Sequence, residues 1–277
     1  MQIIRCATLE ADVPLLWRPA IPVTDAVASS LRAIRRDGRI RAIFYDVGDT
    51  LLTTTPTPEE FTRRVSDELG TVVDAERLKT AFPDIYTFIR LHEAARGGVG
   101  SAWRSDRGIK ELWVDFYLQS FAKAEVDAPE HRLRHVAEQS YDWYTGPEVW
   151  RPFPDVVAAF EAGREAGLIQ GVISDWGTDL LGILNHLGLT DYLQFVVSSA
   201  VVGWAKPHPQ IFWHALNRAG VSPNEAVYVG DFYINDILGA RSVGIHPVLI
   251  DREGTAPPMD CPVIRTLAEL PMAIGAF

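Results

Sequence analysis

Four carboxylates and one lysine stand out, because each follows a predicted strand. Asp46 and Asp49 come after the first strand, Lys206 after the third, and Asp231 and Asp236 after the fourth. The carboxyl ends of parallel strands meet at one edge of a sheet, so we expect these side chains to lie together. Crowded carboxylates repel one another unless a cation neutralises them, and oxygen ligands suit Mg²⁺, which completes its shell with water and phosphate. The spacing therefore favours a Mg²⁺ site.

Two hydroxyl side chains reach the same edge, Thr50 after the first strand and Ser174 after the second. Simpler roles are open for several of these residues: Thr50 could brace its loop, Ser174 could belong to a turn, and Asp236 could cap a helix. Lys206 could be a surface lysine. Only four of the 26 basic residues are lysines, however, so the presence of lysine at this position favours a specific role.

The elements that must position these groups alternate along the chain. Short apolar runs typical of buried strands are separated by helical patterns, which predicts an α/β fold with a parallel sheet and helices on both faces. The predicted strands are 40–45, 168–173, 195–197, 226–229 and 245–250, and the helices between them are 155–166, 178–187, 209–219 and 235–243.

About 90 residues between 53 and 146 carry helical patterns and no strand signal. Thr57, followed by Pro58 and by a glutamate three residues later, opens the first helix, and Gly70 closes it. Further helices are expected from Asp74 to about residue 96, with a break at Pro83, and then over 106–124 and 129–144. We therefore expect an N-terminal extension of unclear role (1–38), an α/β core (39–55 and 147–277) and a helical cap domain (56–146).

Four ordered motifs resemble those of the haloacid dehalogenase (HAD) superfamily of hydrolases, over about residues 40–250. They are DVGDTL at 46–51, GVIS at 171–174, KPHPQIF at 206–212 and GDFYIND at 230–236. The resemblance implies a Rossmann-like core with a cap inserted after the first motif. It also implies that Asp46 is the nucleophile, which accepts the phosphoryl group as an aspartyl-phosphate.

The resemblance extends to the metal and substrate ligands. Mg²⁺ would be held by Asp46, the backbone carbonyl of Gly48 and Asp231, with support from Asp236. Ser174 and Thr50 would contribute to substrate binding, and Lys206 would neutralise charge on the phosphoryl group and on Asp46.

One position departs from the motif. Many phosphatases of this family have a second aspartate two residues after the nucleophile, which protonates the leaving group and then activates water. That position is Gly48 here, and an aspartate follows one step later at Asp49. General acid–base catalysis is typically worth about 10²–10⁴-fold. Asp49 is the first candidate for the acid; weaker candidates are Asp175, His92, His131 and His135.

The leading functional hypothesis is a Mg²⁺-dependent phosphatase that cleaves a small phosphate monoester. Three alternatives stay open: a 2-haloacid dehalogenase, a phosphonate hydrolase that would need a Schiff-base lysine in the cap, and a HAD-fold binding protein with little turnover. The motif at 230–236, with two aspartates, argues against the metal-free dehalogenase. Only Lys79, Lys110 and Lys123 could serve the phosphonate reaction.

Composition limits the other classes of function. The 277 residues carry a net charge of −10, which disfavours general binding of nucleic acids but permits a small phosphorylated substrate. Cys6 and Cys261 are too few and too far apart for a disulfide framework or a zinc site. No apolar run is long enough for a membrane helix, and we expect a cytoplasmic protein without membrane or nucleic-acid partners. It would be a monomer or a homodimer.

Overall fold

A parallel six-stranded sheet forms the centre of the fold. The computed structural model describes residues 25–275 and 277, and its strands run in the order β5, β4, β1, β6, β7, β8, with every neighbouring pair parallel. The strands are β1 (Ala42–Tyr45), β4 (Ile169–Ser174), β5 (Phe195–Ser198), β6 (Ala226–Gly230), β7 (His246–Ile250) and β8 (Val263–Ile264). The predicted α/β fold with a parallel sheet is confirmed.

Strand β1 lies in the middle of the sheet and is buried along its whole length. Ala42, Ile43, Phe44 and Tyr45 are all at most 1% exposed. Both neighbours, β4 and β6, pair with it in register from Ala42 to Tyr45. A continuous apolar run is what a strand covered on both faces requires. The nucleophile candidate Asp46 follows directly, at the carboxyl end of the most enclosed strand.

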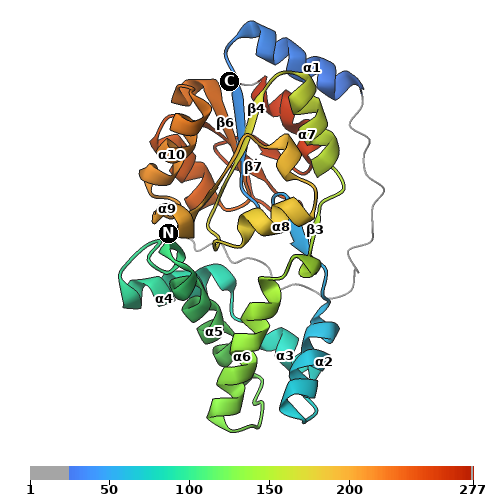
Figure 1. The fold of residues 1–277 in the computed structure, drawn as a ribbon, viewed down its shortest axis with the longest axis vertical. Coiled ribbons are helices and arrows are strands. Elements are labelled where there is room, and N and C mark those ends of the chain that lie inside the picture. The colour runs from blue at the N-terminus through green and yellow to red at the C-terminus, as the bar shows by residue number, and fades with distance from the viewer. Residues whose placement is uncertain (1–24, 276) are drawn as a thin grey trace.

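Helices cover both faces of the sheet (Figure 1). One face packs against four helices, and its buried cluster includes Leu31, Phe160 and Leu180. The other face is covered mainly by the helix that follows Lys206, through Ile211 and Phe212. The helices of the first face are α1 (Asp25–Asp37), α7 (Val156–Glu165), α8 (Leu180–His186) and α12 (Leu270–Ile274), and those of the second are α10 (Pro209–Ala219) and α11 (Gly239–Ser242). The short α9 (Ser199–Val202) follows β5.

Five helices between β2 and β3 form a separate bundle, here called the helical insert (residues 58–144), which lies beyond one end of the sheet in Figure 1. They are α2 (Pro58–Leu69), α3 (Ala75–Ala81), α4 (Ile85–Arg96), α5 (Asp106–Lys123) and α6 (Glu130–Tyr144). Thr57 and Glu60 form the predicted capping box, and Gly70 ends α2 at φ 65°. The insert has its own apolar cluster, which includes Phe61, Leu78 and Phe121. The exact division into domains remains a prediction.

Several elements differ from the sequence-based expectation, and one of them is strand β8, which was not predicted. β2 (Leu52–Thr54) and β3 (Trp150–Pro152) form an antiparallel pair where the chain enters and leaves the insert. Strands of three residues are too short to show a period-two pattern, so they were not predicted. The expected helix 235–243 is instead a π-helix, η5 (Tyr233–Leu238), followed by α11. The carboxylate of Asp236, within this π-helix, accepts a hydrogen bond from the backbone N–H of Phe232 at 2.9 Å. Single-turn π-helices of this kind often occur at functional sites.

The N-terminal extension is described only from residue 25. Its helix α1 packs on α7, where Arg32 forms an ion pair with Glu165 at 3.1 Å. Residues 1–24, with Cys6, lie outside the described part, and Cys261 is a free thiol. Among the described residues, no helix has the length and apolar character that a membrane crossing would need.

Candidate active site

Lys206 lies at the centre of a buried polar cluster at the carboxyl ends of β1, β4 and β6. Its Nζ is 2.7 Å from Asp46 Oδ1 and 2.6 Å from Asp236 Oδ1. The lysine side chain is 4% exposed, and the two aspartates are 9% and 1% exposed. The carboxylates raise the pKa of Lys206 well above its ordinary value and outweigh its desolvation, so the ammonium stays charged.

Tyr228, inside β6, completes the surroundings of this lysine. Its hydroxyl accepts a hydrogen bond from Lys206 Nζ at 3.2 Å and lies 2.9 Å from Asp236 Oδ1 and 3.0 Å from the carbonyl oxygen of Ile173. Sequence reasoning missed this residue. The available signal was a tyrosine in the middle of a buried strand, whose hydroxyl needs a polar partner.

Asp46 receives two hydrogen bonds on one of its oxygens. Lys206 Nζ donates to Oδ1, and Ser174 Oγ donates to the same atom at 2.8 Å. The other oxygen, Oδ2, has neither donor. A carboxylate fixed in this way can present one oxygen to an electrophile while its remaining charge is balanced.

Asp231 is held by hydroxyl groups from two different parts of the chain. Thr50 Oγ1, from the loop after β1, lies 3.4 Å from Asp231 Oδ1. Tyr86, from α4 of the helical insert, donates to Asp231 Oδ2 at 3.3 Å. The Tyr86 ring also stacks on Phe232, with ring centroids 4.1 Å apart and planes at 16°. Tyr86 was not predicted, because its arrival at the site depends on how the insert docks.

The carboxylates can accommodate a divalent cation. One oxygen from each of Asp46, Asp231 and Asp236 lies within 4.8 Å of the others. The pKa of Asp231 is raised well above its ordinary value by burial and by the charges of Asp46 and Asp236. Lys206 supplies one positive charge to this set, so a further cation would relieve the repulsion that remains. An all-oxygen donor set fits Mg²⁺. The carbonyl oxygen of Gly48 accepts the N–H of Thr50 at 2.6 Å and keeps a second lone pair.

Asp49 lies at the same edge but in an unusual backbone conformation. Its φ is 49°, the left-handed region that aspartate tolerates better than most residues. The pKa of Asp49 is raised, mainly because the surrounding protein reduces the hydration of its carboxylate and secondly because of the charge of Asp46. The guanidinium of Arg252 opposes this shift. An aspartate with a raised pKa retains a proton to higher pH, as a general acid must.

Gly48, two residues after Asp46, faces an indole ring. A Cβ placed on Gly48 would lie 3.8 Å from Trp176, an ordinary contact distance. Trp176 in turn packs edge-to-face on Trp150, with centroids 4.7 Å apart. The structure therefore leaves room for a side chain at this position.

Asp175, next to Ser174, is fully hydrogen-bonded below the cluster. Its Oδ1 accepts the backbone N–H of Lys206 at 2.9 Å, and its Oδ2 accepts a hydrogen bond from Asn235 Nδ2 at 3.3 Å. Burial raises its pKa to about 7, against the opposing charge of Lys206. Through the bond to the N–H of Lys206, Asp175 helps to position the segment that carries the lysine.

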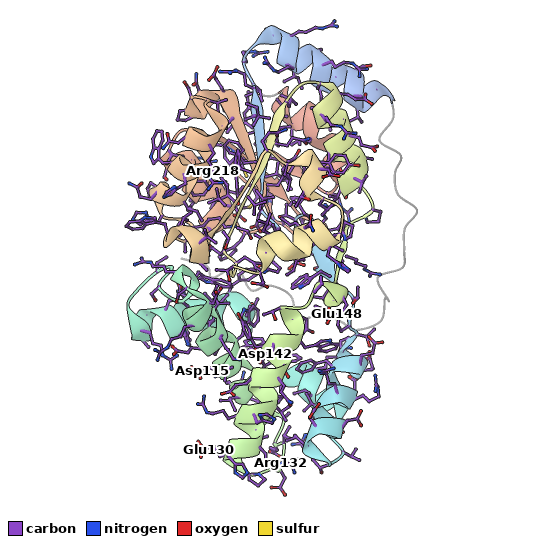
Figure 2. All side chains as sticks on the ribbon, in the orientation of Figure 1. Asp115, Glu130, Arg132, Asp142, Glu148 and Arg218 are labelled. Carbon is purple, nitrogen blue, oxygen red and sulfur yellow. The ribbon has the colours of Figure 1, made fainter. Side chains whose placement is uncertain are left out.

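The three candidate histidines do not join the cluster. His92 is buried within the insert, where its Nε2 lies 3.3 Å from Asp115 Oδ2. His131 and His135 are exposed on α6. Figure 2 shows Glu130 and Arg132 at the end of α6 farthest from the sheet.

A partly buried arginine supports the loop after β1, which begins with Asp46. Arg252, after β7, forms an ion pair with Asp155 at 2.6 Å and donates to the carbonyl oxygen of Thr50 at 2.6 Å. The two side chains are 13% and 6% exposed. Sequence reasoning did not single out either residue, since their partners are distant in sequence.

Comparison with known proteins agrees with this arrangement. The family model of haloacid dehalogenase-like hydrolases matches residues 40–244. The chain belongs to the haloacid dehalogenase-like hydrolases. The match starts just before β1 and ends after α11, so it spans all four motifs and the insert. The chain is therefore a hydrolase of the HAD family.

Individual relatives carry different names. A haloacid dehalogenase-like hydrolase domain-containing protein 3 from Danio rerio is 32% identical over 84% of this chain and 95% of its own length. A glyceraldehyde 3-phosphate phosphatase from Methanopyrus kandleri is 30% identical over 77% of this chain and 84% of its own. The crystal structure of a HAD phosphatase from Thermococcus onnurineus matches with a TM-score of 0.55 and 26% identity, over 85% of this chain and 98% of that one. The solved structures that match also include two dehalogenases.

Proposed function

We propose that this hydrolase is a Mg²⁺-dependent phosphatase, which cleaves a small phosphate monoester through an aspartyl-phosphate on Asp46. One observation carries the proposal. Asp46 Oδ1 is bound by Lys206 and Ser174, while oxygens of Asp231 and Asp236 lie within 4.8 Å of an Asp46 oxygen. The single lysine leaves part of the negative charge of the three carboxylates without a counter-charge, which a bound metal ion would supply. A phosphatase-named relative at 30% identity supports the same reaction class.

In this proposal each residue of the cluster has a distinct role. Asp46 attacks phosphorus with the oxygen that neither Lys206 nor Ser174 binds, and the ester oxygen leaves. Lys206 balances negative charge on Asp46 and on the phosphoryl oxygens, which lets two anions approach. Mg²⁺, held by Asp46, Asp231 and the carbonyl of Gly48 with support from Asp236, would supply further charge neutralisation. Ser174 and Thr50 border the phosphoryl position.

Asp49 is the proposed general acid. It lies near enough to Asp46 for that charge to raise its pKa, so the proton is available to a departing alkoxide. In the second half-reaction its carboxylate would take a proton from the water that attacks the aspartyl-phosphate. The helical insert would act as a cap, because it places Tyr86 against the carboxylates and can exclude bulk water.

The alternatives of the same fold fit the site less well. A metal-free dehalogenase has no need of Asp231 and Asp236 beside the nucleophile, where they repel it. A phosphonate hydrolase would need a lysine of the insert in the site. Lys110 instead pairs with Asp142 on α6 at 2.7 Å, and in the described residues neither Lys79 nor Lys123 contacts the carboxylates.

The decisive experiment is hydrolysis of an aryl phosphate, with Mg²⁺ and with a chelator, by the wild type and by Asp46→Asn. An aryl leaving group departs with little acid assistance, so the assay does not depend on the acid. We expect turnover that needs both Mg²⁺ and Asp46, with a loss of at least about 10⁴-fold in the variant. Equal rates for the two proteins would refute the mechanism. Absence of turnover in the wild type would favour the dehalogenase, phosphonate or binding functions, and assays with a 2-haloacid and a phosphonate would separate them.

The acid is tested with Asp49→Asn on two substrates. If Asp49 is the acid, the variant loses about 10²–10⁴-fold on an alkyl phosphate and much less on an aryl phosphate. If the variant has the same ratio of alkyl-phosphate to aryl-phosphate rate as the wild type, and the same pH profile, Asp49 is not the general acid.

A further inference from the structure

One residue of the helical insert reaches the metal-binding carboxylates. Tyr86 is the second residue of α4, whose start is fixed because Asp84 accepts the N–H of Thr87 at 2.8 Å. From there its hydroxyl extends to Asp231 Oδ2, and its ring lies flat on Phe232. The stacked ring fixes the direction of the hydroxyl, since the phenol can rotate little against a parallel neighbour.

The other end of α4 also contacts the core. Gly100, in the loop that follows this helix, has φ 75° and lies close to Ala205; a Cβ on it would be 3.1 Å from Ala205 Cβ and 3.8 Å from the carbonyl oxygen of Lys206. The start of α4 therefore lies beside Asp231, and the loop after α4 lies beside Ala205. Tyr86 is held in place by more than its own hydrogen bond.

Asp231 thus has one hydroxyl partner from the core and one from the insert. Thr50 lies against Oδ1 and Tyr86 against Oδ2, at 3.4 and 3.3 Å, both longer than the usual O–H···O distance. A phenol hydroxyl carries its proton at neutral pH, so Tyr86 donates to the carboxylate of Asp231. Partners that orient a metal-ligating carboxylate typically change metal affinity by about 10–100-fold.

We propose that Tyr86 is a positioning residue for the metal site, which orients the carboxylate of Asp231 and so couples docking of the helical insert to Mg²⁺ binding. The inference rests on the metal site of the proposed function. Because coupling is reciprocal, Mg²⁺ that binds better to the docked form must also stabilise docking.

The test uses the full-length protein and MgCl₂. Isothermal titration calorimetry, without substrate, compares the wild type with Tyr86→Phe, which keeps the stacked ring and removes the hydroxyl. Tyr144→Phe, in the apolar cluster of the insert, is the matched control. We expect the Mg²⁺ dissociation constant to rise about tenfold in Tyr86→Phe and to stay within about twofold of wild type in the control.

Hydrogen exchange supplies a second readout. Mg²⁺ should slow amide exchange in α4 of the wild type, and it should do so less in Tyr86→Phe at the same MgCl₂ concentration. Wild-type Mg²⁺ affinity in Tyr86→Phe would overturn the proposal, as would a loss of kcat at saturating Mg²⁺ without weaker binding, because Tyr86 would then act on the substrate.

The results also separate this inference from the proposed function. Weaker Mg²⁺ binding in Tyr86→Phe, together with a wild type that hydrolyses no phosphate ester, would support the inference and refute the phosphatase. A wild type that binds no Mg²⁺ would overturn the inference and the metal dependence together.

Discussion

Asp106 and Thr178 join the helical insert to the loop after β4 by two hydrogen bonds. The N–H of Thr178 donates to Asp106 Oδ1 at 2.8 Å, and its hydroxyl donates to Oδ2 at 2.7 Å. Asp106 is the first residue of α5, and Thr178 lies four residues after Ser174. This contact and the one between Tyr86 and Asp231 therefore connect the insert to the core from two different helices.

We expect Asp106→Ala to loosen the insert with little effect on overall stability. Both residues are exposed, and exposed polar contacts contribute about 1 kcal/mol or less. The variant should show faster amide exchange at the start of α5 and a KM raised several-fold, with kcat close to wild type. Asp142→Ala, which breaks the ion pair with Lys110 within the insert, is the control and should leave KM unchanged. An equal KM in both variants would show that the contact has no part in substrate binding.

A carboxylate at position 48 should improve catalysis on poor leaving groups. Gly48 does not have a positive φ, and its Cβ position meets only Trp176 at contact distance, so a side chain is tolerated. Gly48→Asp should raise the rate on an alkyl phosphate by up to about 10²-fold, since it places a carboxyl group at the position that the motif resemblance implies for the general acid. Gly48→Ala controls for the added bulk. Rates that rise equally in both variants, or fall in Gly48→Asp, would contradict the expectation.

Removal of the lysine should destabilise the fold as well as abolish turnover. In Lys206→Met the carboxylates of Asp46 and Asp236 remain buried without their cation, which costs about 3–5 kcal/mol in the free energy of unfolding. Urea denaturation measures this loss. Lys110→Met, which breaks a surface pair, should cost at most about 1 kcal/mol.

The lysine variant should also respond to pH in a defined direction. Burial already raises the pKa of Asp236 in the folded state, and loss of the ammonium raises it further. A carboxyl with a raised folded-state pKa favours the native state at low pH and disfavours it as the pH rises through that pKa. The difference in free energy of unfolding between wild type and Lys206→Met should therefore decrease as the pH falls from 8 toward 5. An increase in this difference would contradict the explanation.

Asp175 should make wild-type stability depend on pH near neutrality. Its folded-state pKa of about 7 lies above its ordinary value of 3.8, so the native state binds the extra proton. The associated stability is present at low pH and is lost as the pH rises through 7, by about 1.4 kcal/mol between pH 6 and 8. Asp175→Asn should remove this part of the dependence in urea titrations at those two pH values. An identical slope in wild type and variant would assign the proton to another group.

Much of the core could be predicted because each part carries a local signal. Asp46, Lys206, Asp231 and Asp236 follow buried apolar strands, and the topology of a parallel sheet brings strand ends together without further information. Caps such as Thr57 marked the helices of the insert directly. The structure places all four residues in one cluster, while their catalytic roles remain to be tested.

The rest of the site depends on long-range packing. Tyr86 reaches Asp231 across 145 positions, and Arg252 reaches Thr50 across 202. No local pattern distinguishes Tyr86 from the other aromatic residues of the insert, which form its apolar cluster. Tyr228 was missed for a different reason. In the sequence it belongs to an apolar strand pattern like its neighbours, and only the fold shows that its hydroxyl contacts Lys206.

The short pair of β2 and β3 has a consequence for how this architecture can vary. The chain leaves the core along one of these strands and returns along the other, hydrogen-bonded side by side with Thr54 opposite Trp150. Adjacent strands are only about 4.8 Å apart, so everything between them begins and ends at almost one point. A bundle of another size or shape could be exchanged there without moving the sheet or its strand ends. Chimeras that graft a different insert between residues 54 and 150 would thus keep the sheet and its strand-end residues, but they would lose the hydroxyl that Tyr86 presents to Asp231.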